Sequence, residues 1–405
     1  MKTPSVTEGM GFINYAFPEF GLRVMAERFT DEGQAELSFF LTNKTGDSFI
    51  HATRVNLLAT VTMNSLEKRL EKNSREIPWT DVLTYITGKT IEIARRGEPA
   101  TEIWPDDNDT LEIEYLLKPF IYLNHPTVIF GDYGSLKSLM SLVIAYTVQL
   151  PYRENNLDLI TTENSTKCLY LDYEDDPSSF RKRWSALERG IGHKGAVSIL
   201  HQRMTAPLAD SVSSLQRSIH DSAIGLLIVD SLGPAARGNL NDPEPAIKYH
   251  AALRQLGVTS LTLAHTAKDQ IGQKRSIFGS VFFTNLSRSV WECKAEQETG
   301  EDEAIISLKH TKANLSRRHH ALGYRFTFTN NSIAVVKADL RDTGLSGELP
   351  LTLRIKDLLR SSAMTVKDIA SSLDHNEASI RTIINRMAKK GILLKVGESW
   401  GLQSI

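Results

Sequence analysis

The chain has 405 residues, 41% of them hydrophobic and 23% charged, a composition typical of a globular protein with roughly two or three domains. Its 47 lysines and arginines balance 48 acidic residues, and a net charge of −1 excludes a wholly basic, histone-like protein. Two cysteines without a CxxC motif argue against a disulfide scaffold or a cysteine zinc site. Because no secretory signal and no apolar run of about 18 residues are visible, we expect a cytoplasmic protein without a membrane partner.

Residues 1–115 are predicted to form a small α+β domain whose role the sequence does not indicate. A stretch containing Gly, Pro and acidic residues at 97–108 is predicted to be a linker. The other expected elements are strands at 20–29, 35–43 and 49–57 and helices at 61–72 and 79–95.

From 116 to 340 the pattern predicts an α/β domain with a parallel sheet. Short runs of β-branched and apolar residues alternate with helical segments, which is typical of parallel strands joined by crossover helices. The expected strands are 127–130, 168–172, 226–230, 260–264, 289–293 and 304–310.

The first of these strands leads into a glycine-containing loop at 131–138, GDYGSLKS, followed by a helical run. This is close to the phosphate-binding pattern G-x-x-x-x-G-K-[ST], except that Leu136 occupies the second glycine position. Lys137 is expected to reach the β- and γ-phosphates of ATP, and the Ser138 hydroxyl to bind Mg²⁺. The candidate nucleotide-binding residues are Gly131, Asp132, Tyr133, Gly134, Ser135, Leu136, Lys137 and Ser138.

Acidic residues end two of the later strands. An apolar strand ends in Asp230, the expected Walker-B position for holding the magnesium shell together with Ser138. Another strand ends in the sequence DYEDD, where Glu174 is the candidate for orienting the attacking water and Asp172 is the alternative. A third strand ends in His265, which we expect to contact the γ-phosphate unless loop backbone satisfies it.

These features in this order resemble the RepA-like AAA-family ATPases of the RecA/DnaB-type hexameric helicase class, as carried by phages, plasmids and mobile elements. The resemblance covers about 10–340 and depends on these motifs: GDYGSLKS, YLDYEDD, IVDSLGPA, LAHTAKD, FGSVFFTNLSRSVWE and LKHTKANLS. It implies a RecA-like core, a homo-oligomer of hexameric type, and ATP and Mg²⁺ as cofactors.

The resemblance also implies roles for single residues. Glu174 matches the catalytic glutamate, Asp230 the magnesium-shell aspartate and His265 the γ-phosphate sensor. Lys312 matches a lysine that reaches across the subunit interface to the neighbour's ATP. The family's arginine two residues later is Asn314 here, so the other candidates for a finger acting in trans are Arg288, Arg317 and Arg318.

Two loops are candidates for lining a central pore. The resemblance places 268–276 there, and Lys268, Lys274 and Arg275 would then contact the phosphates of a single DNA strand. The alternative is an ordinary surface loop. A second long loop is expected at 234–245.

The last unit, 350–405, resembles a winged helix-turn-helix. A linker at 341–350 precedes it, and nine lysines and arginines against five acidic residues give 351–405 a net charge of +4. The third helix would enter the major groove of duplex DNA, with Arg381 and Asn385 among the contacts, although winged helices also bind proteins. The expected elements are helices at 351–361, 365–373 and 376–390 and a hairpin at 392–396 and 400–402.

The sequence thus favours an ATP-dependent motor linked to nucleic acid, of replicative helicase or translocase type. The alternative is an ATP-gated DNA-binding switch or helicase loader that does not unwind DNA. A small-molecule P-loop kinase is disfavoured because it would leave the C-terminal unit unexplained.

Overall fold

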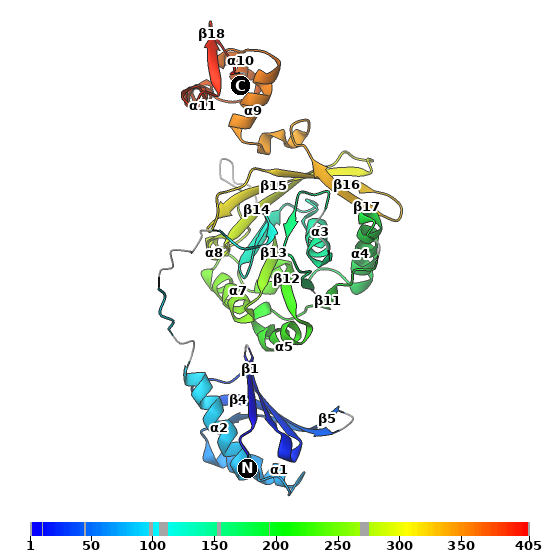
Figure 1. Ribbon diagram of the computed structural model, residues 1–405, viewed down its shortest axis with the longest axis vertical. Helices are drawn as coiled ribbons and strands as arrows, with labels where there is room; N and C mark the ends of the chain where they lie inside the picture. The colour runs from blue at the N-terminus through cyan, green and yellow to red at the C-terminus, as the bar shows by residue number, and fades with distance from the viewer. Residues whose placement is uncertain are drawn as a thin grey trace. The chain divides into compact units, whose positions relative to one another are not determined.

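The computed structural model describes residues 2–9, 11–43, 46–96, 100–104, 112–151, 155–193, 195–267 and 275–403 (Figure 1). The chain divides into two compact units, one of 1–112, 206–225 and 248–258 and the other of 113–205, 226–247 and 259–405. Separate hydrophobic clusters form within 13–91, 116–335 and 355–393. The division at 115 and 340–350 stays a prediction. Among the described residues, no helix is long and apolar enough to cross a membrane.

The N-terminal residues form an antiparallel sheet in the order β1-β2-β3-β4-β5. Its strands are β1 (Ser5–Gly9), β2 (Phe12–Phe17), β3 (Leu22–Glu27), β4 (Gln34–Asn43) and β5 (Gly46–Asn56). Two helices follow, α1 (Thr60–Glu71) and α2 (Trp79–Arg96), as the periodicity predicts. The three predicted strand ranges do not cover β1 or β2, although β2 alternates strictly and buries Ile13, Tyr15 and Phe17. Most of the predicted linker at 97–108 lies outside the described residues.

The second unit is built on a nine-stranded sheet in the order β11-β10-β12-β13-β8-β14-β15-β16-β17. Its strands are β8 (Pro126–Gly131), β10 (Lys167–Asp172), β11 (Leu200–Arg203), β12 (Ile224–Asp230), β13 (Thr259–His265), β14 (Ser289–Glu296), β15 (Glu303–Ala313), β16 (Leu322–Phe328) and β17 (Ile333–Ala338). A smaller sheet contains β6 (Tyr115–Lys118), β7 (Ile121–Tyr122) and β9 (Ile160–Thr161).

The expectation that all core strands are parallel is wrong for the far side of the sheet. β12, β13, β8 and β14 pair in parallel in that order, but β15, β16 and β17 continue the sheet antiparallel. The reason is the length of the connections. Only 297–302 join β14 to β15, too few residues for a crossover helix.

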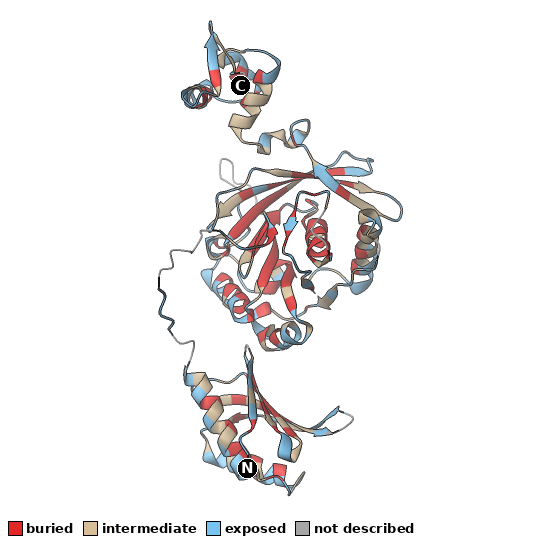
Figure 2. Ribbon diagram, viewed as in Figure 1, coloured by how far each residue is buried: buried red, intermediate tan, exposed pale blue. Residues whose placement is uncertain are grey.

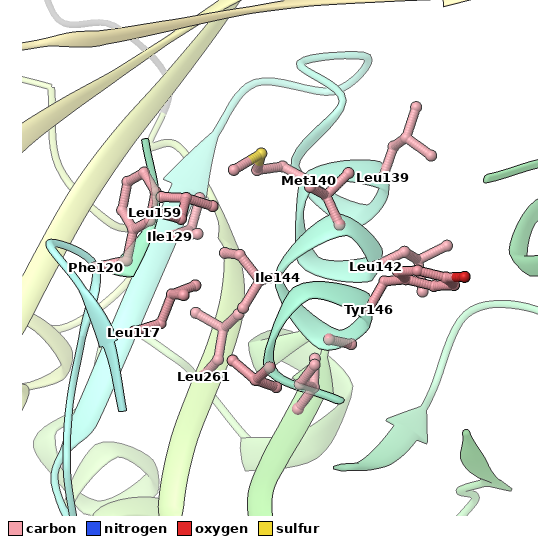
Figure 3. Packing of buried hydrophobic residues seen from close by; sticks show 14 of the residues in the cluster. Leu117, Phe120, Ile129, Leu139, Met140, Leu142, Ile144, Tyr146, Leu159 and Leu261 are labelled. Carbon is pink, nitrogen blue, oxygen red and sulfur yellow. The ribbon is translucent and has the colours of Figure 1, made fainter. Parts of the chain in front are cut away.

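Helix α3 (Lys137–Gln149) follows the phosphate-binding loop and is buried on almost all sides (Figure 2). In Figure 3, Met140 and Ile144 point toward the strand residue Ile129, whereas Tyr146 points away from it. A helix that is apolar all round belongs inside a large core. This packing fixes the first turn of α3, which carries the phosphate-binding residues.

The remaining helices of the first 340 residues connect the strands of this large sheet. They are α4 (Pro177–Ile191), α5 (Val212–Ser222), α6 (Leu232–Ala236), α7 (Pro243–Leu256) and α8 (Val281–Leu286). The predicted long loop at 234–245 is shorter than expected, because α6 and α7 occupy both of its ends.

The C-terminal elements match their predicted boundaries closely. They are α9 (Leu351–Ser361), α10 (Val366–Ser372), α11 (Glu377–Lys389), β18 (Leu393–Val396) and β19 (Ser399–Leu402). Thr365 and Asn376 cap α10 and α11 with their side chains, as the capping patterns predict. The segment before α9 contains a short 3-10 helix, η3 (Gly344–Glu348), whose Glu348 pairs with Lys294 on β14 and Lys309 on β15.

Candidate functional site

The loop between β8 and α3 has the tight geometry that phosphate binding requires. A Cβ on Gly131 would lie 2.4 Å from the carbonyl oxygen of Cys293 and 2.6 Å from Ser135 Oγ, so only glycine fits. Gly134 has a φ of +78°, in the left-handed region that glycine tolerates best. The loop ends at the N-terminus of a 13-residue helix, where free backbone N–H groups attract anions.

Leu136 adopts the left-handed conformation, with φ 58° and ψ 18°, at the position where the motif has glycine. This explains the motif's preference, because a side chain there costs about 1–2 kcal/mol. The Leu136 side chain packs against the core of the domain. The loop therefore keeps its shape with leucine in place, and the contact with the core offsets part of the strain.

Lys137 is buried at the start of α3, and its Nζ lies 3.2 Å from the Asp132 carbonyl oxygen and 3.5 Å from His265 Nδ1. Burial lowers the pKa of the Lys137 ammonium, while Asp230 and Glu174 are among the groups that raise it. The two carboxylates therefore oppose the effect of burial and favour the charged ammonium. This is the arrangement in which a lysine can bind phosphate oxygens.

Asp230 ends β12 beside this lysine and is 5% exposed. Tyr170 Oη donates to Asp230 Oδ2 at 2.7 Å, whereas Oδ1 is buried with no hydrogen-bond partner among the described residues. Burial raises the pKa of Asp230, and the Tyr170 and Ser138 hydroxyls oppose that shift. The peptide bond after Asp230 is cis. A buried carboxylate oxygen without a partner, close to a serine hydroxyl, is a donor set that fits a magnesium ion.

Glu174 lies just beyond the end of β10 and is half-exposed. The Ser231 hydroxyl donates to Glu174 Oε1, and His265 Nε2 lies 3.6 Å from the same oxygen. His265 therefore faces Glu174 with one ring nitrogen and Lys137 with the other. The structure brings together the four residues that the sequence singled out for catalysis, since each follows or ends a neighbouring strand of the sheet.

Asp172, the alternative to Glu174, is 1% exposed, and both of its carboxylate oxygens have partners within the chain. Its Oδ1 accepts the backbone N–H groups of Glu174 and Asp175, and its Oδ2 lies 3.1 Å from His201 Nε2. A carboxylate with this many partners is not available to a water molecule. Asp172 instead shapes the turn that carries Glu174.

The candidate trans residues lie at the opposite end of the sheet from the phosphate-binding loop. β14 runs parallel to β8, with Ser289 opposite Thr127 and Cys293 opposite Gly131. Arg288 precedes Ser289 and is level with Pro126, so it lies roughly 16 Å along the strands from Gly131. Lys312 on β15 pairs with Val290 at the same end. These cations cannot reach the nucleotide site of their own chain.

Lys312 is also held within the chain. Its Nζ donates to the carbonyl oxygens of Thr284, Asn285 and Ser287 at 2.9, 2.9 and 2.6 Å, which closes the C-terminal end of α8. Arg288 and Arg317 are exposed. None of these contacts tests a role in trans, which stays a prediction for Lys312, Arg288 and Arg317.

The candidate nucleic-acid loop begins and ends beside His265. Ala267 N–H donates to the Ser276 carbonyl at 3.0 Å, and Phe278 N–H to the His265 carbonyl at 2.8 Å. Lys268 and Lys274 lie outside the described residues. Arg275 pairs with Asp132 of the phosphate-binding loop at 2.6 Å and lies 3.7 Å from Glu292 on β14. In the C-terminal unit, Arg381 and Asn385 are both exposed on α11.

The sequence analysis did not identify the residues that support the candidate catalytic carboxylates by hydrogen bonds. Tyr170 and Ser231 each donate a hydrogen bond to a candidate catalytic carboxylate. The signal for Ser231 was its place directly after Asp230. Tyr170 gave no signal, because an aromatic residue inside an apolar strand is usually core.

Comparison with known proteins identifies the class. Residues 99–271 match the model of an AAA domain, somewhat less than half of the chain, and no curated protein sequence matches significantly. Together with the loop geometry, this match supports a P-loop ATPase that binds nucleotide. Among solved structures, one similar chain is a KaiC-like protein from the hyperthermophilic archaeon Pyrococcus horikoshii OT3, with 15% identity and a TM-score of 0.38, covering 54% of this chain and 93% of that one. A similarity this weak carries no further argument.

Proposed function

We propose that this protein is an oligomeric ATPase with a RecA-like core that works on nucleic acid, as a replicative helicase or translocase of a mobile element. The observation that carries the proposal is the convergence of Lys137, Asp230, Glu174 and His265 at adjacent strand ends. Free buried thiols at Cys168 and Cys293 are consistent with a cytoplasmic location.

In this proposal, 131–138 wrap the phosphates of ATP and Lys137 binds the β- and γ-phosphates. Ser138 and Asp230 would hold Mg²⁺, which when bound neutralises charge on those phosphates. Glu174, held by Ser231, orients the attacking water and accepts its proton. His265 touches both Glu174 and Lys137, so it is placed to respond when the γ-phosphate leaves.

In this proposal the site is completed by a neighbouring subunit, because the three described finger candidates lie too far from the site of their own chain. Arg288, Lys312 and Arg317 lie at the other end of the sheet and would serve a neighbouring subunit's ATP in a ring of hexameric type. Charge supplied in trans typically contributes about 10³–10⁵ to the rate of such ATPases. Hydrolysis would therefore depend on assembly.

The same site is joined to the candidate nucleic-acid loop. Arg275 at the end of that loop pairs with Asp132, and the loop's base is bonded to His265. A change in the phosphate-binding loop on hydrolysis would therefore be transmitted to Arg275. Lys268 and Lys274, which lie outside the described residues, are proposed to contact single-stranded DNA. The C-terminal unit would bind duplex DNA as a winged helix, through Arg381 and Asn385 on α11.

One observation favours a second function: Lys312 Nζ donates hydrogen bonds to three carbonyl oxygens of its own chain. If no finger acts in trans, hydrolysis is slow and ATP sets only the oligomeric state. The protein would then be an ATP-gated DNA-binding switch or helicase loader.

Steady-state ATP hydrolysis with and without single-stranded DNA separates these functions, with Lys137→Ala as the control. A several-fold stimulation that Lys137→Ala abolishes is expected for a motor. Hydrolysis that ignores DNA supports the switch or loader. Absence of nucleotide binding and hydrolysis at every protein concentration would overturn both.

A further inference from the structure

A buried chain of hydroxyl groups connects the two residues proposed to hold Mg²⁺. Ser141 Oγ on α3 lies 2.7 Å from the carbonyl oxygen of Ser138, one turn earlier. It also lies 3.3 Å from Tyr170 Oη on β10, which is 2.7 Å from Asp230 Oδ2 on β12. Three separate elements therefore meet at two hydroxyl groups behind the site.

These hydroxyls are inaccessible to solvent. Ser141 and Tyr170 are 0% and 1% exposed, and the Tyr170 ring packs on Phe180 with ring centroids 4.9 Å apart. A phenylalanine would fill the same space without needing a partner for a buried hydroxyl. Packing alone therefore does not account for the tyrosine.

The Tyr170 hydroxyl holds the Asp230 carboxylate in one orientation. It donates to Oδ2, which leaves Oδ1 as the buried oxygen without a partner among the described residues. The oxygen that remains unpaired is therefore the one that a divalent cation can bind.

We propose that Tyr170, supported by Ser141, is a positioning residue for the magnesium site, which it serves by holding Asp230 through Oδ2 and leaving Oδ1 free for the cation. The inference rests on the proposed function, since it assumes that nucleotide binds with a divalent cation between Ser138 and Asp230. Residues behind a metal ligand typically contribute about 10- to 100-fold to metal affinity.

Binding of Mn²⁺ to the full chain in the presence of ADP, followed by electron paramagnetic resonance, tests the proposal without relying on turnover. Tyr170→Phe is expected to weaken Mn²⁺ binding by about tenfold. ADP binding in EDTA should stay unchanged. Ser141→Ala should weaken Mn²⁺ binding by roughly threefold, and it tests the same chain if Tyr170→Phe fails to fold.

The matched control is Tyr15→Phe, which removes a buried phenol bonded to Thr90 Oγ1 at 2.8 Å in the N-terminal sheet and should leave Mn²⁺ binding unchanged. Unaltered Mn²⁺ affinity in both Tyr170→Phe and Ser141→Ala would overturn the positioning role while leaving the proposed function intact. If the wild-type protein binds neither ADP nor Mn²⁺·ADP, the proposed function fails and this inference fails with it.

Discussion

The hydroxyl of Ser231 donates a hydrogen bond to Oε1 of Glu174, so the residue after Asp230 on β12 holds the carboxylate at the end of β10. Removing this donor frees a half-exposed side chain to rotate. We expect Ser231→Ala to lower kcat for ATP hydrolysis by roughly three- to tenfold with KM nearly unchanged, since one hydrogen bond contributes about 0.5–1.5 kcal/mol. Steady-state kinetics check this, and an unchanged kcat would show that Glu174 is held by other means.

The shape of the phosphate-binding loop is tested at two positions. Gly131→Ala places a Cβ 2.4 Å from the Cys293 carbonyl oxygen, so we expect loss of ATP binding and destabilisation by about 1–3 kcal/mol. Leu136→Gly relieves the left-handed strain instead and should keep nucleotide affinity within about twofold. Titration with a fluorescent ATP analogue and thermal unfolding measure both effects. Tight ATP binding by Gly131→Ala would contradict the loop geometry.

Asp230 gives cation binding a characteristic pH dependence. Burial raises its pKa, so below that pKa the protonated carboxyl cannot hold a cation, and Mg²⁺-dependent ADP binding should fail at a higher pH than for an exposed aspartate. Adding Mg²⁺ favours the ionised form and should move this acid limb to lower pH. Calorimetric titrations of ADP across pH at two Mg²⁺ concentrations measure the pH midpoint at which binding is lost. A midpoint independent of Mg²⁺ would rule out Asp230 as a ligand.

Without a cation, the same group has the opposite effect on stability. The folded state binds the Asp230 proton more tightly than the unfolded state does. Its contribution to the free energy of unfolding is therefore present at acid pH and is lost as the pH rises through the folded pKa.

The three finger candidates, Arg288, Lys312 and Arg317, predict that two inactive variants restore activity when they are mixed. Lys137→Ala cannot bind nucleotide but keeps its finger candidates. Arg317→Ala keeps an intact nucleotide site but lacks one finger candidate. If Arg317 acts in trans, mixed rings should recover roughly a quarter of wild-type hydrolysis, the fraction of interfaces that combine an intact site with an intact finger. Arg288→Ala and Lys312→Ala are tested in the same way. No recovery in any mixture would favour the switch or loader.

The C-terminal unit should bind duplex DNA through α11. Arg381→Ala is expected to weaken binding by about 1 kcal/mol, with a smaller salt dependence of the affinity if Arg381 contacts a phosphate. The control, Lys367→Ala, removes the same charge from α10. Fluorescence anisotropy at several salt concentrations measures both. Equal effects of the two variants would indicate general charge attraction or a protein-binding role for this unit.

The sequence predicted most of what local chemistry determines. The strand before 131–138, the caps at Thr365 and Asn376 and the helices they begin were found where periodicity and capping patterns placed them. The convergence of Glu174, Asp230 and His265 was also predictable, because carboxyl ends of parallel strands share one edge of a sheet.

What the sequence could not predict depends on pairing and side-chain contacts between distant segments. β15–β17 are antiparallel because only 297–302 join β14 to β15, and the predicted strand ends at 293 and 304 left a longer gap than the structure has. The bond from Tyr170 to Asp230 joins residues 60 positions apart, and the pairing of Arg275 with Asp132 joins residues 143 apart. Such contacts appear only when the strands are assembled.

The central claim is that Lys137 binds ATP and Glu174 activates the water that attacks it. The most direct measurement is phosphate release and nucleotide binding for the wild-type protein, Glu174→Gln and Lys137→Ala under the same conditions. We predict that Glu174→Gln binds ATP like the wild type but releases phosphate at least about 100-fold more slowly. Lys137→Ala should lose nucleotide binding itself. Wild-type hydrolysis by Glu174→Gln, or intact ATP binding by Lys137→Ala, would contradict the account.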